Sequence, residues 1–89
     1  MNATKNGNIE MVIEVVNGAE STQQLLDAVE AIRPAAKVAA YRGEDNIATI
    51  KRIICAIESK HRELLPDIFD ATEDDLTLIT ELQMLRDTM

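Results

Sequence analysis

A heptad spacing of apolar residues constrains the fold of this chain more than any other feature of the sequence. The positions are Ile47, Ile50, Ile54, Ile57, His61 and Leu64. They are three and four residues apart in strict alternation, which places them on one face of an α-helix. Pro66 predicts the end of this helix near Leu65, because proline donates no backbone N–H. We call these six residues the seam, and we expect the seam to join two copies of the chain as a homodimer.

Two capping signals predict further helices. Ser21 with Gln24 has the spacing of a capping box, as does Thr72 with Asp75. The helix that begins at Ser21 presents apolar side chains as far as Ile32. Pro34 is expected to break or kink this helix. Residues 34–42 then form a separate short helix ending at Gly43 or a kinked continuation. The seam helix is expected to begin with Asp45 or Asn46 as its cap.

Residues 9–16 fit two patterns. Ile9, Val12, Ile13 and Val16 fit one face of a helix, whereas Ile9, Met11, Ile13 and Val15 alternate as in a strand. A helix starting at Asn8 is predicted, because no second strand is evident to pair with. Residues 1–7 are polar and aperiodic and are expected to be a loose tail, so residues 8–89 form a single domain. The predicted fold is all-α, a small bundle of four to five short helices.

The composition excludes several classes. The chain has 89 residues, a net charge of −7 and a single cysteine, Cys55. A domain of this size buries only roughly 60–65% of its unfolded surface, which also favours a dimer. The negative charge disfavours nucleic acid and anionic membranes as partners, and no apolar stretch is long enough to span a membrane. One cysteine and no secretory signal predict a cytoplasmic protein, with Cys55 as a small buried side chain.

The charge is unevenly distributed along the chain. Residues 1–32 carry −4, residues 33–62 carry +4 and residues 63–89 carry −7. The simplest interpretation is that the acidic ends fold against the basic middle, within one chain or across a dimer. The alternative is that residues 33–62 bind nucleic acid, although no aromatic side chain lies on the seam helix for base stacking.

No motif for catalysis, cofactor binding or metal binding is present, so we expect no enzyme, cofactor or metal site. His61 is the only histidine and occupies a seam position where isoleucine or leucine is expected. It is interpreted either as a pH-sensitive contact or as a partly exposed imidazole bonded to water or a glutamate.

The segment Asp67–Asp75 combines five acids with an aromatic residue and no base. An apolar anchor inside a charged rim is typical of a protein-binding patch. The predicted contact residues are Asp67, Ile68, Phe69, Asp70, Glu73, Asp74 and Asp75. The other interpretations are that these acids cap the last helix and keep the chain soluble, and that Phe69 belongs to the core.

The function predicted from these features is a small non-catalytic intracellular regulator or inhibitor that binds another protein, and a partner with a basic surface would suit the acidic segment. The alternatives are a nucleic-acid-associated transcriptional regulator that uses residues 33–62, and a structural subunit of a phage or secretion assembly.

Overall fold

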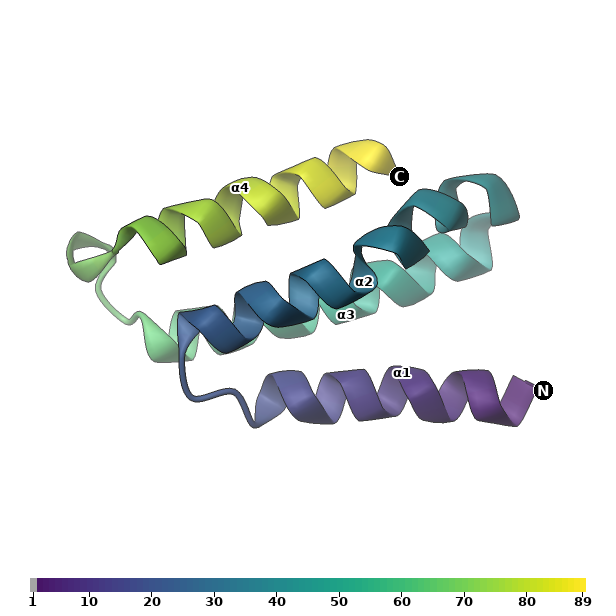
Figure 1. Cartoon of the computed structure of the whole chain (residues 1–89), viewed down its shortest axis with the longest axis horizontal. Helices are drawn as coiled ribbons and strands as arrows, with labels where there is room; N and C mark the ends of the chain where they lie inside the picture. The colour runs from purple at the N-terminus through teal and green to yellow at the C-terminus, as the bar shows by residue number, and fades with distance from the viewer. Residues whose placement is uncertain (1) are drawn as a thin grey trace.

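The computed structural model describes residues 2–89, with the side chains of residues 10–39 and 41–89. The elements are α1 (Asn2–Asn17), α2 (Thr22–Arg42), α3 (Glu44–Leu64), the short 3₁₀ helix η1 (Ile68–Asp70) and α4 (Glu73–Thr88). Residues 2–89 contain no strand, which confirms the all-α prediction. Consecutive α-helices run in opposite directions (Figure 1).

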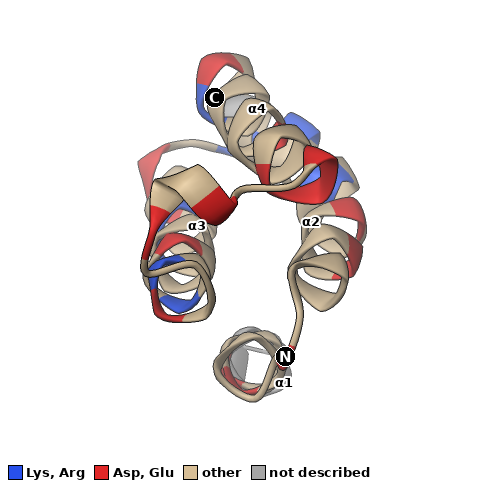
Figure 2. Cartoon of the chain, turned by 90° about the vertical axis from the view of Figure 1, so that its left-hand side faces the viewer, with Lys and Arg blue, Asp and Glu red and all other residues tan. Residues whose placement is uncertain are grey.

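The α2–α3 pair forms the centre of the bundle. α1 packs mainly against α3, and α4 packs mainly against α2. Viewed from one end, α1 and α4 therefore lie on opposite sides of the central pair (Figure 2). Each outer helix thus packs mainly against the central helix that is not its neighbour in sequence.

The core is aliphatic and receives side chains from all four α-helices. Its largest fully buried members are Leu25, Ile54, Ile57, Leu78, Val16 and Val29. Neither aromatic residue of the chain takes part, because both Tyr41 and Phe69 are more than nine-tenths exposed.

The seam belongs to this core and is not a free dimer surface. Ile50, Ile54, Ile57 and His61 are buried within the single chain, and Ile47 and Leu64 pack partly buried against the same cluster. The prediction that these six residues join two copies of the chain is therefore corrected. Heptad spacing specifies a helix face that needs an apolar neighbour, but it does not specify whether that neighbour is in the same chain.

Two predictions about local structure are also corrected. α1 begins at Asn2, so residues expected as a loose tail are helical and Asn8 lies inside the helix. Extending an existing helix costs far less than nucleating one, and the polar start carries no stop signal. Pro34 lies inside a continuous α2, so residues 34–42 are not a separate short helix. Ile32 and Ala36 are buried on either side of it, and their packing offsets the cost of a proline in a helix.

Helix ends follow the predicted caps in part. The Ser21 hydroxyl accepts a hydrogen bond from the Gln24 backbone N–H, while the Gln24 side chain accepts from the N–H of Glu20. α3 begins at Glu44, earlier than expected, because Gly43 makes the whole turn between α2 and α3. Gly43 has φ 104° and ψ −177°, a conformation that essentially only glycine adopts.

Acids of both ends form ion pairs with bases of residues 33–62, and one further ion pair has the opposite polarity. Arg33 in α2 pairs with Glu81 in α4, as the charge distribution predicts. Arg86 in α4 binds both carboxylate oxygens of Glu58 in α3, at 2.6 Å each. This bidentate contact keeps the pKa of Glu58 below its usual value.

Candidate protein-binding site

The connection between α3 and α4 forms a turn that is held by hydrogen bonds. The Asp67 carboxylate accepts a hydrogen bond from the backbone N–H of Phe69 at 3.0 Å, and the Asp67 carbonyl accepts from the N–H of Asp70 at 3.0 Å. Ile68 and Phe69 are 61% and 92% exposed on this turn. The competing interpretation that Phe69 is a core residue is therefore wrong.

The acids of the predicted segment divide into two groups. Asp67, Asp70, Glu73 and Asp74 are exposed, as a contact surface requires. Glu73 and Asp74 also occupy the first turn of α4, where the helix dipole favours negative charge. We call Asp67, Ile68, Phe69, Asp70, Glu73 and Asp74 the η1 surface. It lies at the end of the bundle opposite the α2–α3 turn (Figure 1).

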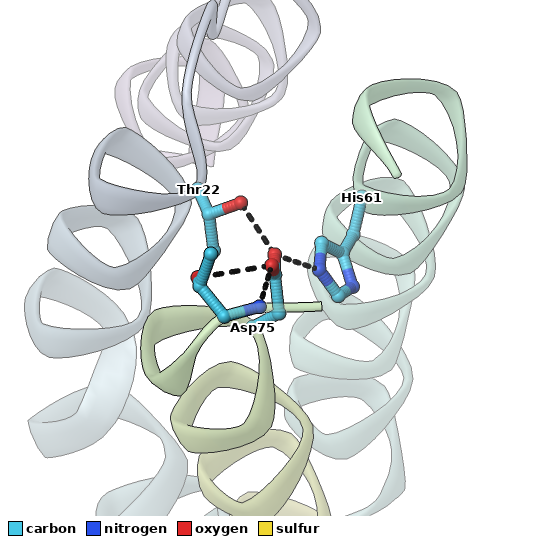
Figure 3. A network of polar contacts seen from close by, with 4 residues as sticks. Thr22, His61 and Asp75 are labelled. Atoms are coloured by element: carbon cyan, nitrogen blue, oxygen red, sulfur yellow. Dashed lines mark hydrogen bonds and ion pairs between the residues drawn. The ribbon is translucent and has the colours of Figure 1, made fainter. Parts of the chain in front are cut away.

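Asp75 is the exception, and its assignment as a partner contact is corrected. Its carboxylate is buried and forms a capping box with Thr72, accepting from the Thr72 N–H at 2.8 Å and hydroxyl at 3.0 Å. The same carboxylate accepts from the Thr22 hydroxyl at 2.7 Å and contacts His61 Nε2 at 2.8 Å (Figure 3). These bonds leave Asp75 inaccessible to a partner.

The four contacts determine the ionisation of Asp75. The Thr72 backbone N–H, with the Thr22, His61 and Thr72 side chains, lowers the pKa of this carboxyl far below its usual value despite its burial. An ionised carboxylate only accepts hydrogen bonds, so the Nε2 atom of His61 carries the proton in this contact. His61 is thus buried against a carboxylate of α4, a partner that neither sequence interpretation named.

This network connects three helices beneath the η1 surface. Thr22 begins α2, His61 lies in the last turn of α3, and Asp75 lies in the first turn of α4. The network fixes the start of α4 relative to α3, and with it the η1 turn between them. His61 and Asp75 each stand out in the sequence, but nothing in the sequence indicates that they meet.

A groove of about 400 Å³ lies between α3 and α4 beside the η1 surface. Its apolar lining consists of Leu65, Ile68, Ile79 and Leu82. Ile68 therefore belongs both to the predicted segment and to the groove. Its polar lining consists of the Glu58–Arg86 pair, His61, Arg62 and Gln83. Ile79 was missed as a site residue, although it falls off the Leu78–Leu82–Leu85 face that is buried in the core.

The remaining candidate residues have no site around them. Cys55 is exposed, which corrects the expectation of a small buried side chain. Among the described residues, no group of three or more histidine, cysteine or acidic side chains is placed to hold a metal ion. None of the helices described is long and apolar enough to cross a membrane.

Comparisons with family models, curated proteins and solved structures found no match to this chain.

Proposed function

We propose that this chain is a small non-catalytic regulator or inhibitor that binds another protein through the η1 surface. The observation that carries the proposal is the 92% exposure of Phe69 on a hydrogen-bonded turn. An aromatic side chain in water forgoes the free energy of burial, which a partner could recover on binding.

The surroundings of Phe69 support a protein as the partner. The neighbouring groove offers Leu65, Ile68 and Ile79 to an apolar side chain of a partner. The exposed acids form a charged rim, which steers association toward a basic surface and changes the rate of association more than the final affinity. Figure 2 shows acidic residues at the α4 end that faces the viewer. The partner is thus expected to present an apolar side chain within a basic patch.

The nucleic-acid alternative has less support. Arg33 is paired with Glu30 and Glu81, and Lys60 is paired with Glu63, so two of the seven bases in residues 33–62 are engaged by acids of the same chain. The other alternative, a subunit of a larger assembly, predicts particles that form from this chain alone.

Capture from a lysate of the source cell tests whether the exposed acids of the η1 surface contribute to partner binding. We expect the chain to retain one protein with a basic surface, and Asp70→Asn with Asp74→Asn to slow association with it about tenfold at low salt. The matched control is Glu44→Gln with Asp45→Asn, which removes two acids near the first turn of α3 at the opposite end. We expect this control to associate like wild type.

Three outcomes would contradict the proposal. The first is equal association by both double variants. The second is retention of nuclease-sensitive material with a steep salt dependence, which would favour nucleic-acid binding. The third is assembly of the purified chain into large particles, which would favour a structural subunit.

A further inference from the structure

α2 has a second apolar face that the core does not use. Leu25, Val29, Ile32, Ala36 and Ala39 are buried on the core face. The second face carries Ala31, Pro34, Ala35 and Val38, which are exposed. These positions recur every three or four residues, so they line one side of the helix. Apart from proline, their side chains are small, which lets another helix approach closely.

This face lines two hollows. The first lies between α1 and α2, and the second is also bounded by α3 through Asn46, Thr49, Ile50 and Ile53. The two hollows have volumes of about 780 and 450 Å³ and adjoin one another, since both are lined by Val12 and Ala31. Met11 and Val15 of α1 line the first hollow and are 63% and 66% exposed. We call Met11, Val12, Val15, Ala31, Ala35 and Val38 the α1–α2 groove.

The two ends of the groove carry opposite charges. Asp27 lines one end and Arg42 lines the other. The exposed charges of α2 follow the same order, with Asp27 and Glu30 in its first half and Lys37 and Arg42 in its second. A surface with an apolar centre, a negative end and a positive end is complementary to a second copy of itself rotated by 180°. A two-fold symmetric interface requires this self-complementarity.

We propose that the α1–α2 groove binds a second copy of this chain, with the two α2 helices antiparallel. In this arrangement Asp27 of each copy lies toward Arg42 of the other, whereas a parallel arrangement would place like charges together. The contact covers the exposed Met11, Val15 and Val38 side chains. It also adds buried apolar area to a chain whose own core is small. The η1 surface, at one end of the bundle, stays free.

Sedimentation equilibrium of the full chain tests this proposal. We expect wild type to have twice the monomer mass of 9.9 kDa. Ala35→Glu should raise the dimer dissociation constant about 100-fold, because it places an unpaired charge at the apolar centre. Ala48→Glu is the matched control, since Ala48 is an exposed alanine inside α3 that does not line the groove. We expect this control to remain a dimer, and both variants to keep the helical circular dichroism of wild type.

A charge exchange tests the orientation. Asp27→Lys and Arg42→Glu should each weaken the dimer, and the double variant should restore it because the pairs form again with reversed sign. A monomeric wild type, or an unchanged dissociation constant in Ala35→Glu, would overturn the proposal. A double variant no stronger than the single ones would overturn the antiparallel arrangement. Loss of the dimer in Phe69→Ala would place the contact on the η1 surface instead, which would also overturn the proposal.

Discussion

Asp75 connects the stability of the chain with the geometry of its candidate site. Its carboxylate receives hydrogen bonds from Thr22 of α2 and Thr72, and it contacts His61 of α3. Because its pKa is held far below the value of about 3.9 in an unfolded chain, its stabilising effect is complete above about pH 5 and decreases as the pH falls toward 2.

Asp75→Asn tests this effect. The amide lacks the charge that strengthens these bonds, so we expect the free energy of unfolding at pH 7 to fall by about 2 kcal/mol. The decrease in stability between pH 5 and 2 should become smaller than in wild type. Urea unfolding over this pH range measures both quantities, with the exposed Asp74→Asn as control. Equal pH profiles for wild type and Asp75→Asn would show that the network does not hold the carboxylate ionised.

At the scale of single elements, the turn between α2 and α3 depends on Gly43. A side chain there would meet no atom within 4 Å, so the cost of Gly43→Ala comes from the backbone conformation alone. We expect this substitution to lower the free energy of unfolding by about 1–2 kcal/mol. Gly18→Ala is the control, because Gly18 has no positive φ and its nearest neighbour would be 3.4 Å away. Urea unfolding that shows equal effects for the two alanines would contradict the strain at Gly43.

Some features of these helices could be predicted from the sequence, and others could not. The face of α3 and the Thr72 start of α4 were predictable, because helix periodicity and capping act over a few residues. The neighbour of the α3 face was not, because that depends on how four helices pack together. The second face of α2 was missed because Ala31 and Ala35 are weak apolar signals. The exposure of Phe69 agrees with its prediction as a contact residue and excludes the core position that the sequence also allowed, whereas the burial of Asp75 depended on two other helices.

At the scale of the whole molecule, the two proposals assign separate tasks to two surfaces. The η1 surface is acidic and carries Phe69 at one end of the bundle, whereas the α1–α2 groove runs along its side and has charges of both signs. A dimer formed through the groove would carry two copies of the η1 surface. Such a dimer could bind two partner molecules, or one partner with repeated sites, more tightly than a single chain.

The dissociation rate of the captured partner from Phe69→Ala tests the role of Phe69 most directly. Tyr41→Ala is the matched control, because Tyr41 is 91% exposed on the last turn of α2 at the opposite end. We expect Phe69→Ala to dissociate about 30-fold faster than wild type and Tyr41→Ala to dissociate at the wild-type rate. Both variants should keep the wild-type midpoint of urea unfolding, since neither ring is part of the core. Equal dissociation rates for the two variants, or a loss of several kcal/mol of stability in Phe69→Ala alone, would contradict a binding role for Phe69.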